Sequence, residues 1–186
     1  MRPLKLAAIA TGTIGALLIG FLVIGFLMPA EWEAEYAAEI EASPERVFAH
    51  LASAAAWEEW TPSPDSGVEV FGPEEGEGSG RRWDDTGYGQ GEFVITRSDP
   101  PRMLEYRVEV EGGSIVIEGR MTLEAVGSGT RVHWTESGDF GRNPLLGYMA
   151  GQMGELQGAQ LEASLASLRR LVEAGVLLEE GPDDDG

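Results

Sequence analysis

The chain has 186 residues, enough for one domain and a short appendage. It carries 13 basic and 32 acidic residues, a formal net charge of −19. This charge argues against binding nucleic acid through phosphates, or an anionic membrane surface by charge alone. The absence of cysteine excludes disulfides and cysteine-ligated metals, and two histidines, His50 and His133, are too few for an all-histidine site. We therefore expect no metal and no cofactor.

The N-terminal segment predicts a membrane anchor. Arg2 and Lys5 precede an uncharged run, residues 6–30, that is rich in leucine, isoleucine, alanine and glycine. At about 1.5 Å per helical residue the run could cross a hydrocarbon core of about 30 Å, and it is longer than the apolar part of a signal peptide. The basic flank and Trp32 predict a single-pass helix in a bacterial inner membrane, with the domain in the periplasm or outside the cell. We therefore expect residues 1–30 to be a cytoplasmic stub and a transmembrane anchor.

The next segment predicts a strand and two short helices. Residues 32–41 alternate between apolar and acidic side chains, which is typical of a half-buried strand. Ser43-Pro44-Glu45 has the residues of a helix start: a capping hydroxyl, an early proline and an early acid. Trp57 and Trp60 are three residues apart and predict a second short helix. We favour packing onto the sheet over ligand contact for this pair.

The middle of the chain has the short apolar runs and closely spaced turns that are typical of antiparallel β-structure. Turns rich in glycine or proline separate six apolar or alternating runs: 68–71, 81–86, 91–97, 104–111, 115–123 and 130–136. Six consecutive strands predict a meander.

The last predicted element is a long helix. Asn143-Pro144 resembles a cap followed by proline, and the helical pattern continues to about Glu173, with Gly175 closing the helix. One stripe of its first half carries four glycines: Gly147, Gly151, Gly154 and Gly158. Each costs a helix about 1 kcal/mol relative to alanine, so we expect close backbone approach or space for a ligand there. Residues 176–186 predict an acidic, disordered tail.

Three features resemble a known family. They are the N-terminal apolar run, the paired tryptophans within Ala42 to Trp60 (ASPERVFAHLASAAAWEEW), and Ser137 to Met149 (SGDFGRNPLLGYM). Together they resemble the SRPBCC superfamily of START and birch-pollen-allergen-like proteins. More narrowly, they resemble its membrane-anchored bacterial polyketide cyclase/dehydrase-like branch. This chain has Ser63 where that branch would have a further tryptophan, so no pocket contact by such a ring is expected.

The resemblance implies an α+β helix-grip fold over residues 31–175. A curved antiparallel sheet would wrap around the long C-terminal helix, and the transmembrane helix would precede it. Such a sheet and helix enclose a cavity that suits a hydrophobic small molecule or lipid. By strand alternation and helical position we expect the following residues to point inward, and for any single one we favour core packing over ligand contact: Trp83, Phe93, Ile95, Tyr106, Val108, Ile117, Met121, Trp134, Met149, Met153 and Leu156.

Two aspartates invite a catalytic interpretation. Asp84 and Asp85 are consecutive on a strand, so their side chains point to opposite faces and cannot act as a pair. Asp85 lies two residues after Trp83 on the strand, so its side chain is expected to point to the same, inner face, and it is the better catalytic candidate of the two aspartates. His133 alternates out of phase with its apolar neighbours and is expected to face outward, and Asp139 is expected to brace the turn before the last helix.

Glu136 is the second catalytic candidate. It shares the parity of Trp134, so it is expected to face the interior. A carboxylate buried there would need a partner such as Arg107 or Arg120.

Three functions stay open at this point. The favoured one is a membrane-tethered domain that binds a hydrophobic small molecule or lipid, because no catalytic constellation stands out. The second is a polyketide cyclase/dehydrase-like enzyme that acts on an apolar substrate through Asp85 or Glu136. The third is a non-catalytic module whose acidic face meets a basic protein partner.

Overall fold

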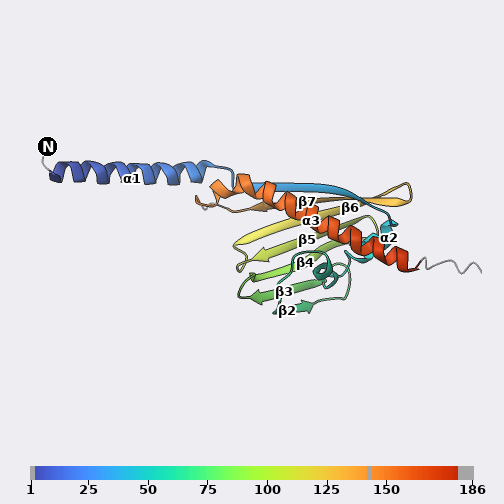
Figure 1. Ribbon diagram of the computed structural model, residues 1–186. Helices are drawn as coiled ribbons and strands as arrows, with labels where there is room; N and C mark the ends of the chain where they lie inside the picture. The colour runs from blue at the N-terminus through green and yellow to red at the C-terminus, as the bar shows by residue number, and fades with distance from the viewer. Residues whose placement is uncertain (1–2, 142–143, 180–186) are drawn as a thin grey trace, which may run out of the picture.

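The computed structural model describes residues 3–141 and 144–179. Its helices are α1 (Pro3–Leu27), α2 (Pro44–Ala49), the 3-10 helix η1 (Ala56–Glu59) and α3 (Gly147–Glu179). Its strands are β1 (Glu31–Ile40), β2 (Val68–Phe71), β3 (Gly80–Asp85), β4 (Gly89–Asp99), β5 (Met103–Val110), β6 (Ile115–Val126) and β7 (Gly129–Asp139). Helix α1 projects away from a domain in which α3 lies across one face of the sheet (Figure 1).

The sheet has seven antiparallel strands in the order β1-β7-β6-β5-β4-β3-β2. Strands β2 to β7 follow one another as neighbours, which is the predicted meander, and β1 pairs with the last strand. The curved antiparallel sheet and the C-terminal helix confirm the helix-grip architecture. Strands distant in sequence therefore meet along one inner face, which lies under α3.

The two faces of the sheet follow from the alternation of residues. On β7, Val132, Trp134 and Glu136 are buried on the inner face, whereas His133 between them is exposed. The outward position predicted for His133 is confirmed. The outer face carries exposed ion pairs such as Arg131 with Glu39, which contribute little to stability because water screens them.

The two short helices between β1 and β2, α2 and η1, contribute buried side chains to the hydrophobic core. Pro44 occupies the first turn of α2 as predicted, but the Ser43 hydroxyl makes no capping hydrogen bond. The second helix is the short 3-10 turn η1. The Trp57 indole donates to the backbone oxygen of Leu51 at 2.9 Å, which fixes the ring on the inner side of the sheet.

Helix α3 differs from the prediction at both ends. It begins at Gly147, because Pro144 lies in a turn before it, and it continues through Gly175 to Glu179. Asn143 and residues 180–186 of the predicted tail lie outside the described residues, and residues 176–179 belong to the helix.

The glycine stripe of α3 is explained at only some of its positions. A Cβ atom on Gly154 would lie 2.7 Å from the Glu33 carbonyl oxygen of β1, so only glycine permits this approach. A Cβ atom on Gly147 would lie 2.6 Å from the carbonyl oxygen of Gly25. Nothing lies within 4 Å of the corresponding position at Gly151 or Gly158. The expected close approach therefore occurs at alternate members of the stripe.

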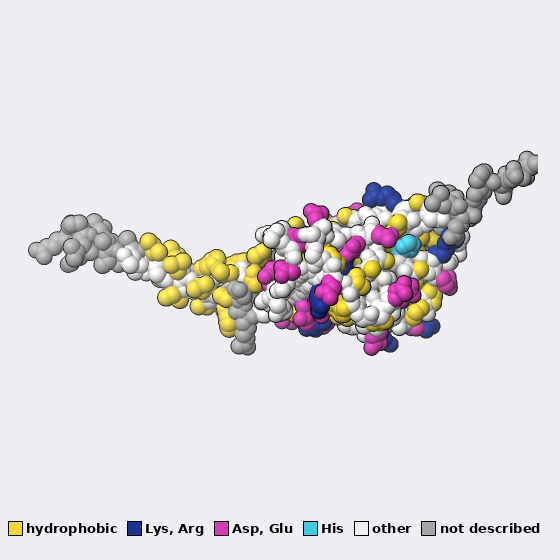
Figure 2. Space-filling model, turned by 90° about the horizontal axis from the view of Figure 1, so that it is seen from below, with side chains coloured by type: hydrophobic (Ala, Val, Ile, Leu, Met, Phe, Trp, Pro, Cys, Tyr) yellow, Lys and Arg dark blue, Asp and Glu magenta, His cyan; other side chains and the backbone are white. Residues whose placement is uncertain are grey.

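Helices α1 and α3 meet where the domain begins. The Phe21 and Tyr148 rings stack with their centroids 4.5 Å apart, and the Tyr148 hydroxyl donates to the Phe21 carbonyl at 2.7 Å. Hydrophobic side chains cover the visible part of α1, and acidic side chains are spread over the domain (Figure 2). Within the part of the chain described in full, no helix combines the length and apolar character that crossing a membrane requires.

Candidate functional site

A pocket of about 370 Å³ lies between the inner face of the sheet and α3. Its volume is at the small end of the roughly 300–1,000 Å³ range of small-molecule sites. Aromatic and aliphatic side chains supply most of its wall, with polar groups at a few positions. The lining comprises Trp57, Thr61, Pro62, Arg81, Trp83, Tyr88, Phe93, Tyr106, Val108, Val110, Ile117, Trp134, Glu136, Gln157, Gln160, Leu161 and Ser164.

Glu136 is the buried acid of this pocket. Its carboxylate accepts a short hydrogen bond from the Tyr106 hydroxyl and a second one, at 2.5 Å, from the Gln157 amide of α3. The Trp134 indole in turn donates to the Tyr106 oxygen at 2.8 Å. These four side chains, from β5, β7 and α3, form one connected polar network inside an apolar wall.

The backbone register explains how Tyr106 reaches Glu136. Gly119 of β6 pairs with Tyr106 on one side and with Glu136 on the other. A Cβ atom on Gly119 would collide with the Tyr106 ring, so the ring lies over the place that a side chain would fill. Glycine at this position lets a tyrosine cross one strand and touch an acid two strands away.

The environment shifts the titration of both groups. Burial raises the pKa of Glu136, although the hydrogen bonds from Tyr106 and Gln157 favour its ionised form. Burial and the neighbouring Glu136 carboxylate raise the pKa of Tyr106 well above 10.0. The tyrosine is therefore a hydrogen-bond donor at neutral pH, and the acid holds a proton more readily than an exposed glutamate does.

An aromatic cluster surrounds this network. The Trp57 ring centroid lies 4.6 Å from those of Trp60 and Phe93, 4.8 Å from that of Tyr106 and 5.9 Å from that of Trp134. Trp57 thus packs η1 onto the sheet as predicted, and the same ring forms part of the pocket wall. Trp57 therefore packs η1 against the sheet and lines the pocket under α3 with the same ring.

The residues predicted to face the cavity divide into three groups. Those that line the pocket are Trp83, Phe93, Tyr106, Val108, Ile117 and Trp134. Ile95 and Met121 are fully buried in the core beside it, and Met153 packs against the core. Met149 and Leu156 lie elsewhere, with 50% and 65% of their surfaces exposed.

Helix α3 turns a different stripe inward from the one expected. Ala150, Leu161 and Leu165 lie on its buried side. Met149 and Leu156 are displaced around the helix from that side, because each residue advances by about 100°. The close approach of Gly154 to β1 sets this rotation.

Asp85 has a structural role at the β3–β4 turn. Its carboxylate accepts hydrogen bonds from the backbone of Gly87 and Tyr88, at 2.8 and 2.9 Å, and from the Ser66 hydroxyl at 2.9 Å. These bonds lower its pKa. Asp85 does not line the pocket, because the strand ends there and the side chain turns back to cap the hairpin.

Two further expectations concern carboxylate partners. Asp139 accepts a hydrogen bond from the Gly141 backbone at 2.7 Å, so its predicted role as a turn brace is confirmed. Arg107 and Arg120 pair instead with glutamates of neighbouring strands, such as Glu118 at 3.3 Å and Glu105. The arginine partner expected for Glu136 is therefore replaced by Tyr106 and Gln157.

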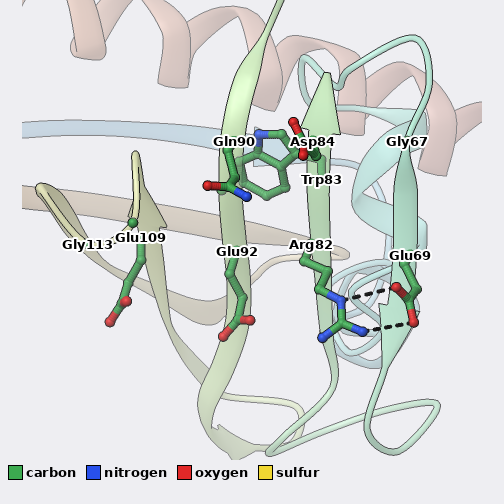
Figure 3. A pocket seen from close by; sticks show the side chains of 11 residues that line it. Gly67, Glu69, Arg82, Trp83, Asp84, Gln90, Glu92, Glu109 and Gly113 are labelled. Carbon is green, nitrogen blue, oxygen red and sulfur yellow. Dashed lines mark hydrogen bonds and ion pairs between the residues drawn. The ribbon is translucent and has the colours of Figure 1, made fainter. Parts of the chain in front are cut away.

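A second hollow, of about 510 Å³, lies over β2 to β5 (Figure 3). Its side chains include Glu69 and Arg82, joined by two hydrogen bonds of 2.9 and 3.1 Å, with Glu92 and Glu109 on the next strands. These carboxylates are spread along the sheet and do not converge on one point (Figure 3). We regard the pocket under α3 as the better candidate, because its wall is mostly apolar and the network of Glu136, Tyr106 and Gln157 is buried within it.

Several lining residues were not expected from the sequence. Gln157 and Ser164 come from the inward stripe of α3, and Arg81 lies two residues before Trp83 on the same face of β3. Because Arg81 lies two residues before Trp83, strand alternation could have predicted that it faces the pocket. No comparable signal pointed to Gln157, since its contact depends on how α3 docks.

Comparisons with known proteins agree with this architecture. The sequence profile of the family described as polyketide cyclase/dehydrase and lipid transport matches residues 31–173. Norcoclaurine synthase from Thalictrum flavum, solved with dopamine and hydroxybenzaldehyde, is 13% identical with a TM-score of 0.60, over 82% of this chain and 92% of that one. A conserved protein from Geobacillus kaustophilus is 17% identical with a TM-score of 0.59, over 76% and 95% of the two chains.

A third solved structure is longer than this chain. DynU16, from the dynemicin biosynthetic locus, is 15% identical with a TM-score of 0.57 over 77% of this chain, which spans 48% of DynU16. Identities this low establish a shared fold alone. No curated protein sequence matches the chain.

Proposed function

Because the chain belongs to the polyketide cyclase/dehydrase and lipid transport family, we propose that its domain binds a hydrophobic small molecule or lipid in the pocket under α3. The observation that carries this proposal is the pocket itself. Aromatic and aliphatic side chains line about 370 Å³ of space, and buried polar groups stand at separate points of the wall. An apolar ligand would gain burial along the wall and orientation from the polar groups.

Filling the pocket tests the proposal. Ile117→Trp places a large ring at a partly buried lining position, so we expect this variant to bind less ligand from the expression host than the wild-type chain binds. The matched control is Val126→Trp, at an exposed position on the same strand and outside the pocket. Native mass spectrometry and solvent extraction measure the bound ligand in both variants. Equal occupancy in wild type and Ile117→Trp would contradict the proposal.

A second candidate function is catalysis of the cyclase/dehydrase type. The observation that favours it is Glu136, a buried carboxyl group with a raised pKa that touches the Tyr106 hydroxyl inside the pocket. Burial makes such a group hold its proton more readily than an exposed glutamate, and carboxyl groups tuned in this direction serve in general acid–base catalysis. The ligand pocket is common to both candidates, so Glu136 is the residue that separates them.

The N-terminal segment adds a tether to the proposal. What supports it is the uncharged run of residues 6–30 after Arg2 and Lys5, together with the exposure of large apolar side chains such as Leu17 and Ile19 on α1. A tether beside a bilayer would raise the local concentration of membrane-borne ligands. The proposed location is a bacterial inner membrane, with the domain on its outer side.

Charge substitutions in α1 test the tether. Each arginine at the centre of a spanning helix costs about 2.5–3.5 kcal/mol of insertion free energy, so Leu18→Arg with Ile19→Arg is expected to move the chain from the membrane fraction to the soluble one. Val126→Arg, at an exposed apolar position of the domain, is the control. Alkaline carbonate extraction followed by immunoblotting gives the distribution. Release of the wild-type chain by carbonate would refute the tether.

A further inference from the structure

Strand β3 carries two buried N–H donors without acceptors. Arg81 and Trp83 lie on the same face of β3, with only 6% and 8% of their surfaces exposed, and both line the pocket under α3. Arg81 Nε and Trp83 Nε1 make no hydrogen bond within the described part of the chain. Leaving a donor buried and unpaired costs free energy, so two of them on one wall indicate a missing acceptor.

Among the described residues, only one long ion pair, with Glu58, offsets the charge of Arg81. Its Nη1 donates to the Ser63 hydroxyl at 3.0 Å and its Nη2 to the Thr61 hydroxyl at 3.3 Å. The nearest carboxylate, that of Glu58, is 3.9 Å away and its side chain is 42% exposed. The guanidinium also lies over the Phe93 ring, 5.7 Å from its centroid. Hydroxyls and a ring orient the guanidinium, but they provide no negative charge inside the pocket.

The two charged groups of the pocket lie on strands that are each one position in from an edge of the sheet. Arg81 is on β3 and Glu136 on β7, with β4, β5 and β6 between them. Neighbouring strands lie about 4.8 Å apart, so the two backbone positions are separated by about 19 Å along the sheet. Phe93, Val108 and Ile117 line the wall between these positions. A ligand anchored at Arg81 would therefore lay an apolar body along the middle strands.

We infer that the β3 end of the pocket binds the carboxylate of an amphipathic ligand, with Arg81 and Trp83 as the donors. A planar carboxylate matches a guanidinium edge, and the indole N–H offers a further bond on the same wall. The inference rests on the proposed function and narrows its ligand class to acids with an apolar body. A neutral apolar ligand of the same shape would leave both donors unpaired.

The test compares an acid with its neutral isostere. Phenylpentanoate and phenylpentanamide are titrated into the full-length chain in lipid nanodiscs by calorimetry, and empty nanodiscs supply the baseline. The wild-type chain is expected to bind the acid about ten-fold more tightly than the amide, because hydrogen bonds to charged groups are the stronger ones. Arg81→Gln is expected to abolish this preference while amide binding changes less than about three-fold.

Two further variants keep the test decisive. Trp83→Phe keeps a six-membered aromatic ring and removes the pyrrole ring with its N–H, so it is expected to lower the acid preference, and any effect of the smaller ring is shared by the amide. Arg82→Gln, on the opposite face and paired with Glu69, is the control and is expected to change neither affinity. Equal affinities of the wild-type chain for the two probes, or a preference that survives both Arg81→Gln and Trp83→Phe, would overturn the inference and leave the proposed function standing. Binding of neither probe would count against both.

Discussion

Trp57→Ala is expected to cost about 3–5 kcal/mol of unfolding free energy, a large part of the total stability of a small domain. The indole contacts four other aromatic rings and donates to the Leu51 backbone, so its removal leaves a cavity and an unpaired carbonyl together. The cavity would lie between η1 and the sheet, where three of the neighbouring rings come from separate strands and cannot all close inward. Chemical denaturation followed by circular dichroism measures the loss.

A second aromatic residue provides the control for Trp57. Tyr88 also lines the pocket, but it is 46% exposed and makes one ring contact, with Trp83, at 6.1 Å. Tyr88→Ala is therefore expected to cost about 1 kcal/mol or less. A similar cost for the two substitutions would show that the cluster around Trp57 does not hold η1 on the sheet.

Most of the sheet could be predicted because alternation is a local signal. The buried positions of β7 follow from parity alone, and so does the inward direction of Glu136. The same rule failed for Asp85, because parity holds only while the strand continues. At the β3–β4 hairpin the backbone turns, and the carboxylate binds the amides of Gly87 and Tyr88 instead. The direction of a side chain at the end of a strand is therefore set by its hydrogen bonds within the adjoining turn.

The candidate site was less predictable because it depends on contacts between elements. Gln157 reaches Glu136 only because Gly154 lets α3 approach β1 closely and so fixes the rotation of the helix. The same rotation moves Met149 to the exposed side. Helical periodicity gives the spacing of a buried stripe but not its angle. Tertiary packing sets that angle, and no single residue of α3 reveals it.

Glu136→Gln is expected to stabilise the domain relative to wild type at neutral pH, by an amount on the order of 1 kcal/mol. Burial raises the pKa of Glu136 in the folded chain above its ordinary value of 4.5. The folded state thus holds this proton more tightly than the unfolded state, and the contribution of Glu136 to stability falls as the pH rises from 4.5 through the folded pKa. Glutamine has no charge to bury, so its advantage should vanish below pH 4.5. Denaturation of both proteins over a pH series measures the difference.

Glu136→Leu is the contrasting variant. It removes the acceptor and leaves the Tyr106 hydroxyl and the Gln157 amide buried without their partner, which is expected to cost about 1–3 kcal/mol at every pH. Glutamine keeps an acceptor for Tyr106, and the amide of Gln157 can rotate to meet the new group. A stability difference between wild type and Glu136→Gln that does not change with pH would contradict the raised pKa.

Glu136→Gln also separates the two candidate functions. If Glu136 transfers a proton, Glu136→Gln should lower turnover of a bound substrate about 10²–10⁴-fold while the ligand stays in the pocket. If the domain only binds, Glu136→Gln should retain the extracted ligand and change its affinity only slightly. Occupancy by native mass spectrometry and product formation by chromatography are measured on the same samples. Glutamine keeps the size of glutamate and one acceptor oxygen, but it replaces the second oxygen with an NH2 donor and has no titratable proton, so the variant tests proton transfer at one atom position.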